Sequence, residues 1–240
     1  MIVSHKHKYV FIQSPHTGCT AVGRELVDFY DGEPMLFKHA AYHDFLRAAT
    51  PAMKQYFVFS TVRNPIDELV SFYYKLKSNH GEDFTRPERL KINGGWVTPR
   101  IIKRYQAVQD ENLSFIDYLA RFYRMPHVNW TVLDHKKFDY VMRYESLQDD
   151  FSVALNKLGI EQLRSIPVVN PTKKDNDDII STLTAEELET LAWVIGPLLD
   201  YWDYPAVSDN NTTIPNKNKL AFDVMCLVKK TYWRYIRHLT

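Results

Sequence analysis

Short polar segments that follow apolar runs contain residues suited to binding phosphate groups. The first is Pro15-His16-Thr17-Gly18-Cys19-Thr20, which follows apolar residues 9–12 and precedes a helical pattern of apolar residues. Backbone N–H groups of such a loop, together with the positive end of the helix dipole, attract an anion. Gly18 lets the backbone approach a ligand closely, and the Thr17 and Thr20 hydroxyls are further donors. The pattern predicts a phosphate-binding loop, although an ordinary strand-to-helix turn without a ligand fits it equally well.

Two other kinds of phosphate loop do not fit this segment. A Walker A loop contains a Gly-Lys pair, whereas the segment has one glycine and no lysine, which argues against hydrolysis of ATP or GTP. A cysteine phosphatase would need an arginine at a fixed distance after Cys19. Arg24 is one residue too near, and Glu25 occupies the required position.

A second polar segment follows the apolar run 56–62, which we predict to be a strand. Arg63-Asn64-Pro65 comes next, and then apolar residues recur at helical spacing as far as Tyr74. Pro65 suits the first turn of a helix, and Ser71 lies about two turns into it. The planar guanidinium of Arg63, beside the start of a helix, is suited to bind a phosphate bidentately.

Together with two later segments, these motifs resemble those of PAPS-dependent sulfotransferases of the carbohydrate or general type, PAPS being 3′-phosphoadenosine-5′-phosphosulfate. The loop is similar to the family's Pro-Lys-Thr-Gly-Gly-Thr, and Val62-Arg63-Asn64-Pro65 with Ser71 is similar to its Val-Arg-Asn-Pro followed by a serine. Arg143-Tyr144-Glu145-x-Leu147 and Asn170-Pro171-Thr172-Lys173-Lys174 resemble its Arg-Tyr-Glu-x-Leu and Asn-x-Ser/Thr-Lys-Arg segments. The motifs occur in the family's order, between about Tyr9 and Tyr204.

The resemblance implies an α/β fold, with a parallel sheet flanked by helices as in P-loop NTPases. It implies a sulfotransferase that moves the sulfuryl group of PAPS to a hydroxyl or amine of a small-molecule or carbohydrate acceptor. PAPS would be the co-substrate, and no metal would be required, because the histidines form no metal-ligand pattern with an acidic residue. The residues expected to bind PAPS are Pro15, His16, Thr17, Gly18, Cys19, Thr20, Arg63, Ser71, Lys173 and Lys174.

His16 departs from the family pattern, in which a lysine contacts the bridging oxygen and the sulfate. A lysine is a permanent charge, whereas an imidazole is cationic only below a pKa near 6.5. Neighbouring phosphates favour the cationic form, so we expect His16 to act as the cation, with Lys38 as a substitute. The alternative is that the substitution has weakened or abolished turnover.

Sulfuryl transfer also needs a base that takes the acceptor's proton. Histidine suits this role because its pKa lies near neutral pH. Leu36-Phe37 could form a short strand, and in related sulfotransferases a histidine at the end of that strand is the base. His39 is therefore the predicted base, with His43 as the reserve; a structural role is the alternative for both.

Two functions of other classes compete with this hypothesis. One is a phosphotransferase on the same P-loop-like fold, which the missing Gly-Lys pair opposes. The other is a non-catalytic nucleotide-binding protein derived from the sulfotransferase fold, which His16 leaves open.

The composition is that of a globular protein with one large domain. The chain has 240 residues and a formal net charge of +1, so no nucleic-acid partner is expected. No apolar run approaches the roughly 20 residues of a membrane span, and two cysteines cannot form a disulfide framework. Golgi members of the family carry an N-terminal membrane anchor. Because the sequence shows no such segment, we expect a cytoplasmic location.

The chain divides into three parts by its pattern. Residues 1–205 form the expected sulfotransferase domain, in which strands alternate with helices. A polar excursion at 77–95 is predicted to be a mobile acceptor lid or a passive loop. Residues 206–215 form a linker, and 216–240 form a basic amphipathic helix. That helix either packs on its own domain, dimerises or contacts a membrane surface.

Overall fold

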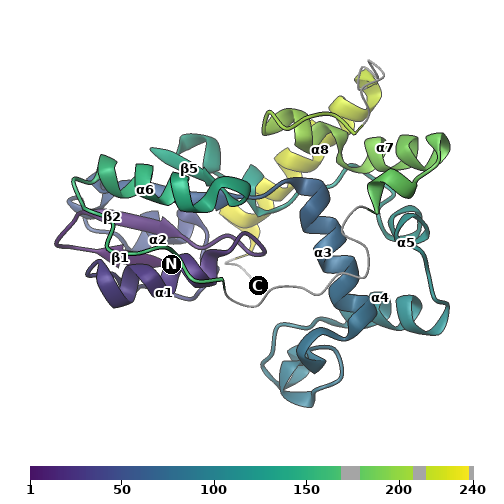
Figure 1. Ribbon diagram of the computed structural model, residues 1–240, viewed down its shortest axis with the longest axis horizontal. Helices are drawn as coiled ribbons and strands as arrows, with labels where there is room; N and C mark the ends of the chain where they lie inside the picture. Colours follow the sequence, from purple (N-terminus) through teal and green to yellow (C-terminus); the bar gives the residue numbers. More distant parts are fainter. Residues whose placement is uncertain (169–178, 208–214, 238–240) are drawn as a thin grey trace. The chain divides into compact units, whose positions relative to one another are not determined.

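The computed structural model describes residues 1–168, 179–207 and 215–237 (Figure 1). The chain forms two compact units, which we describe separately. The first consists of Met1–Asn64, Val128–Asn170 and Val224–Thr240, and the second consists of Pro65–His127 and Pro171–Asp223. This division differs from the expected domain boundaries at 205 and 215. The predicted linker lies largely outside the described residues.

The first unit is built on a five-stranded sheet. Its strand order is β3-β1-β2-β4-β5. β2 and β5 both pair parallel with β4, while β1 pairs antiparallel with β2 and β3. The strands are Ile2–Ser4 (β1), Tyr9–Ile12 (β2), Glu33–Pro34 (β3), Phe57–Val62 (β4) and Tyr140–Arg143 (β5). The predicted parallel arrangement is thus confirmed for three strands, and the antiparallel edge is an addition to it.

Helices bury both faces of this sheet, which explains why β2 is apolar at every position. Successive side chains of a strand point to opposite faces. Tyr9 and Phe11 pack in one core with α1 and α6, whereas Val10 and Ile12 pack in a second core with Phe45 of α2. The helices are Cys19–Phe29 (α1), Tyr42–Ala48 (α2) and Leu147–Lys157 (α6).

The segment between β3 and α2 differs from its prediction. Leu36 and Phe37 do not form a strand: Leu36 has a left-handed backbone with φ of 58°, and Lys38 and His39 occupy a turn. The edge strand is instead Glu33–Pro34, because its backbone pairs with β1.

The second unit is helical. Its helices are Pro65–Ser78 (α3), Pro99–Asp110 (α4), Phe115–Phe122 (α5), Ala185–Tyr201 (α7) and the first part of Asn216–Thr231 (α8). The hydroxyls of Ser114 and Thr184 cap α5 and α7 by accepting N–H groups of the first turn. Buried aromatic rings hold the helices together, with Tyr73 of α3 packing on Phe115 and Tyr118 of α5.

Helix α7 continues past Gly196 and through Pro197, a residue that usually kinks or ends a helix. Pro197 lies inside the helix and has no N–H to give to the carbonyl of Trp193. The side-chain amide of Asn218 donates to that carbonyl at 3.1 Å. The helix therefore continues because a residue far along the chain replaces the missing donor.

The polar excursion at 77–95 contains local structure of its own. It has 3₁₀ turns at His80–Glu82, Pro87–Arg89 and Lys91–Asn93. Phe84, which is buried, stacks on the ring of Tyr105 in α4. Its predicted role as a lid stays a prediction.

The remaining short elements complete the described chain. They are 3₁₀ turns at Met53–Gln55, Trp130–Val132, His135–Lys137, Tyr144–Ser146 and Ile180–Thr182, and a π turn at Tyr232–Ile236 that continues α8. Among the described residues, no helix has the length and apolar character that crossing a bilayer requires.

Candidate functional site

The predicted phosphate loop joins the end of β2 to the start of α1. Two residues in it have left-handed backbones, His16 with φ of 64° and Gly18 with φ of 73°. Gly18 is the N-cap of α1 and has no side chain to occupy the helix end. The first N–H groups of a helix have no carbonyl partner within it, and in α1 these belong to Cys19 and Thr20. The loop therefore has the backbone geometry of an anion site.

The side chains of this loop play different parts from those the sequence suggests. Thr17 is buried, and its hydroxyl donates to the carbonyl of Ser14 at 2.9 Å and contacts the hydroxyl of Thr61. It therefore shapes the loop instead of facing a ligand. Burial raises the pKa of the Cys19 thiol, so the group stays protonated at neutral pH and is not a nucleophile.

Lys38 brings a permanent positive charge to the loop. Its Nζ donates to the hydroxyl of Thr20 at 2.8 Å, at the N-terminal end of α1. Lys38 comes from the turn after β3, 18 residues along the chain from Thr20. Sequence analysis gave Lys38 only as a substitute for His16, because no local pattern indicates that this turn lies beside the loop.

A buried polar network holds the start of the loop at Ser14, and sequence analysis missed this network. Nε2 of His135 lies 2.6 Å from the Ser14 hydroxyl and 3.0 Å from that of Ser60, and Ser60 donates to the carbonyl of Ile12 at 2.6 Å. Burial lowers the pKa of His135 to about 3, so the ring is neutral at ordinary pH. If Nε2 carries the proton, each hydroxyl both donates and accepts, because donation runs from His135 through Ser14 and Ser60 to Ile12.

Tyr144 connects the loop to Arg63. A Cβ placed on Gly18 would lie 3.0 Å from the Tyr144 ring, so the glycine allows this close approach. The Arg63 guanidinium lies over the same ring, 4.5 Å from its centre. In the described part of the chain, Nε of Arg63 is buried without a hydrogen-bond partner. Next to Tyr144, the Glu145 carboxylate accepts the N–H of Asn64 at 2.6 Å, which is a structural role.

The predicted base, His39, lies beside the same loop. Its Nδ1 is 2.8 Å from the carbonyl of Gln13. Because a carbonyl can only accept, Nδ1 carries the proton and Nε2 has the lone pair that a base needs. Burial lowers the pKa of His39 from its ordinary 6.5, the Gln13 carbonyl opposes this shift, and the charge of Lys38 adds to it. The ring is therefore neutral near pH 7.

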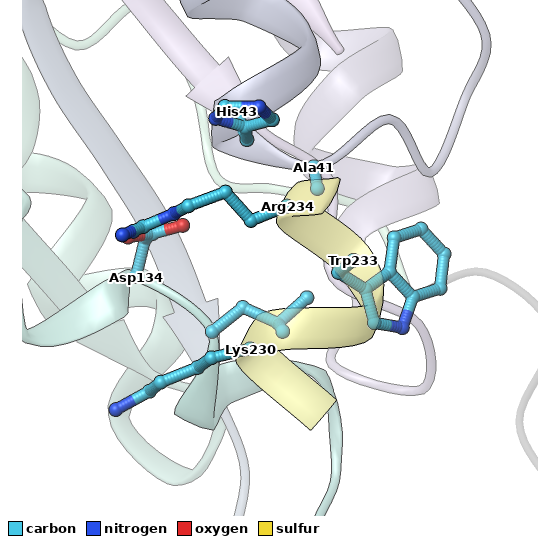
Figure 2. Close-up of a pocket in the computed structure, with 7 residues that line it drawn as sticks. Ala41, His43, Asp134, Lys230, Trp233 and Arg234 are labelled. Carbon is cyan, nitrogen blue, oxygen red and sulfur yellow. The ribbon is translucent and has the colours of Figure 1, made fainter. Parts of the chain in front are cut away.

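The reserve base, His43, has different surroundings. It lines a small hollow with Asp134, Lys230, Trp233 and Arg234, of water-sized volume, about 10 Å³ (Figure 2). The two cations and the tryptophan come from the C-terminal helix. Nothing in this hollow corresponds to the loop's anion site, so His39 is the stronger candidate.

Comparison with known proteins decides the family. A model described as "Sulfotransferase family" matches residues 1–191. The chain belongs to the sulfotransferase family. It is 26% identical over 205 residues to carbohydrate sulfotransferase 10 of Pongo abelii, covering 71% of this chain and 56% of that protein. The human protein of the same name is 25% identical over 205 residues, with the same coverage.

A further relative has the same name. Carbohydrate sulfotransferase 10 of Gallus gallus is 25% identical over 207 residues, covering 71% of this chain and 55% of the relative. The chain spans little more than half the length of these relatives. No solved structure matches it.

In this member of the sulfotransferase family, the residues predicted to bind PAPS fall into three groups. The loop from Pro15 to Thr20 and Arg63 belong to the first unit, where Tyr144 touches both. Ser71 is buried on α3, in the second unit, so its joint contact with Arg63 on one phosphate stays a prediction. Lys173 and Lys174 lie outside the described residues. No group of three or more His, Cys, Asp or Glu suited to a metal occurs in the part of the chain that the structure describes.

Proposed function

We propose that this sulfotransferase moves the sulfuryl group of PAPS to a hydroxyl of a carbohydrate acceptor. The observation that carries the proposal is the grouping around residues 13–20: an anion-binding loop, the ammonium of Lys38 against it, and His39 held on the carbonyl of Gln13. A cationic hydrogen-bond donor, Lys38, and a neutral base, His39, thus lie beside the same loop.

The 5′-phosphosulfate would lie on the loop. N–H groups of the first turn of α1 would face its oxygens, and Lys38 would supply the charge that the family's loop lysine supplies, with His16 as a second candidate. These donors would stabilise the phosphate oxygen as it becomes negative. Because Thr17 uses its hydroxyl within the loop, it would contribute through its backbone alone.

His39 would accept the proton of the attacking hydroxyl at Nε2. The acceptor oxygen forms a bond to sulfur while the bond from sulfur to the phosphate oxygen breaks, and the products are the sulfated acceptor and 3′-phosphoadenosine-5′-phosphate (PAP). A base that is neutral at pH 7 can take this proton without first losing one.

Arg63 would bind the 3′-phosphate, which distinguishes PAPS from ADP or ATP. Tyr144 stacks on the guanidinium and fixes its plane, and the partnerless Nε gives it a donor still to be satisfied. From the motif spacing we include Ser71, Lys173 and Lys174 in this role. The proposed acceptor class rests on the names of the relatives. The same chemistry would also allow transfer to an amine or to a hydroxyl that does not belong to a sugar.

Two measurements test the proposal. Calorimetry with PAP, ADP and ATP should show preference for PAP, and equal binding would favour a phosphotransferase. A panel of carbohydrate, phenol and amine acceptors incubated with labelled PAPS should show transfer to at least one sugar. Tight PAP binding with no transfer to any acceptor would favour the non-catalytic alternative.

We also propose a cytoplasmic location, supported by the two cysteines, Cys19 and Cys226, which are buried and form no disulfide in the described part of the chain. Fractionation of cells that express the chain would test it. The expected partners of the C-terminal helix, a second copy or a membrane surface, are independent of sulfuryl transfer.

A further inference from the structure

The C-terminal residues 224–237 contact the first unit through basic and aromatic side chains. Nζ of Lys229 donates to the carbonyl of Val128 at 2.9 Å, and Arg237 pairs with Asp44 at 3.3 Å. Arg234 reaches Asp134 at 3.5 Å, as Figure 2 shows. The ring of Trp233 lies 4.3 Å from that of Trp130. The segment is thus held in place by its cations.

Most of its apolar side chains face outward, although Cys226 is buried. Leu227 is 66% exposed, Val228 57% and Tyr235 61%. Others on the same side are also exposed: Val224, Tyr232 and Ile236. These residues recur at intervals of three and four, which places them on one face of a helix. An ordinary surface helix buries its apolar stripe and exposes its charges, whereas most of this stripe is exposed and three of its cations contact the first unit. The segment packs on its own unit, as one of the three alternatives from the sequence has it, but most of the apolar stripe does not take part in that packing.

An exposed apolar face along one side of a helix is a candidate surface for a partner. The two occupants that the sequence suggests differ in the area they need. Fourteen residues of helix are about 21 Å long and about 10 Å wide, or roughly 200 Å² in outline. A stable dimer buries about 800 Å² on each partner. This face alone is too small for a second copy, whereas a bilayer needs only that the face enter it.

Charge points to the same occupant. Residues 224–237 contain four cations, Lys229, Lys230, Arg234 and Arg237, and no acidic residue. Three of these, Lys229, Arg234 and Arg237, already contact the first unit, which leaves Lys230 for an outside partner. The Lys230 ammonium pairs with no carboxylate among the described residues, and its side chain lines the hollow beside Asp134 and Trp233. Anionic headgroups would complement it.

We propose that the exposed apolar face of residues 224–237 lies on the surface of an anionic lipid bilayer. Leu227, Val228 and Val224 would enter the boundary of the acyl chains, to the shallow depth that interfacial helices reach. Tyr232 and Tyr235 would lie at headgroup level, where amphipathic rings are stable. Lys230 would contact the lipid phosphates.

Flotation with lipid vesicles tests this interaction without any measurement of sulfate transfer. The full chain should float with vesicles of phosphatidylcholine mixed with phosphatidylserine, and less with phosphatidylcholine alone. Burial of one leucine is worth roughly tenfold or more in an equilibrium constant. The double variant Leu227→Gln/Val228→Gln should therefore reduce the partition coefficient at least tenfold. Leu163→Gln is the matched control, because Leu163 is 64% exposed elsewhere in the same unit.

Each outcome supports or overturns the proposal. The proposal is supported if the double variant no longer floats with vesicles while Leu163→Gln still does. It is also supported if Lys230→Gln binds anionic vesicles more weakly than the parent but binds phosphatidylcholine vesicles equally. Circular dichroism should show that the double variant is folded, since the replaced side chains are exposed. The proposal would be overturned in favour of a second copy if the parent had the mass of two chains in solution without lipid and the double variant had the mass of one. Absence of flotation with either vesicle would also overturn it.

Discussion

Replacing His39 separates the chemical role of the ring from its structural role. The variant His39→Asn keeps an amide donor close to the position of Nδ1, so the hydrogen bond to Gln13 can persist, but it has no base. The variant His39→Ala loses both. The parent bond is 2.8 Å long and half-buried, so its loss alone should cost about 1 kcal/mol of unfolding free energy.

The two effects differ in size. General-base catalysis contributes about a hundredfold to ten-thousandfold, which is about 3 to 5 kcal/mol of activation free energy. Both variants should lose that much in kcat at saturating PAPS, while PAP affinity stays within about threefold of the parent. Only His39→Ala should also lose stability. Single-turnover transfer of labelled sulfate, calorimetry with PAP and urea unfolding give the three quantities.

The pH dependence gives an independent check. The neutral ring is the active form, and burial lowers the pKa of His39 below 6.5. Activity that depends on His39 should therefore be complete at pH 7 and fall only as the pH decreases through that lowered pKa. A His39→Asn enzyme with near-parent kcat would refute the assignment of the base, and an acid limb above pH 7 would refute the argument from burial.

Three further predictions concern the donor site and its support. PAP should bind at least tenfold better than ADP, about 1.4 kcal/mol, and Arg63→Ala should abolish that preference in calorimetry; an unchanged preference would move the 3′-phosphate elsewhere. Lys38→Met should lower kcat about 10²–10³-fold, while His16→Ala stays near the parent; the reverse order would return the cation to His16. The pKa of His135 is about 3 in the folded chain and 6.5 in the unfolded one. The stability that the neutral ring contributes is therefore fully present above pH 6.5 and is lost as the pH falls toward 3. Between pH 7 and 4, urea unfolding should show a loss of about 3 kcal/mol that His135→Gln lacks; equal loss in both would assign the acid effect to other groups.

Features that depend on local pattern were predictable from the sequence. β2 is apolar at Tyr9–Ile12 because both faces of the strand are covered, and the helical spacing of apolar residues after Gly18 corresponds to α1. Thr98 caps α4 and a proline stands at its first position, which are two local signals of a helix start. The loop and Arg63 follow β2 and β4, as their positions after apolar runs predict.

Features that depend on distant residues could not be predicted. Pro197 indicates a helix end unless Asn218 is known to satisfy the carbonyl it leaves open. Lys38 reaches Thr20 only because β3 pairs with β1, and a two-residue edge strand leaves no periodic signal. His135 supports the loop across 121 residues of sequence. Amphipathic spacing in the C-terminal helix gave the two faces but not which of them is turned inward.

Tyr144 limits how this protein can diverge. Its ring fills the space that a side chain at position 18 would need, and it is also the surface on which the Arg63 guanidinium rests. A lineage that replaced Gly18 would displace the ring, and one that lost the ring would leave the arginine without its support. We expect these three positions to be inherited together or replaced together. The proposed binding sites for the 5′-phosphosulfate and the 3′-phosphate would then change together in evolution. The same dependence applies to redesign: a new donor requires a change in all three.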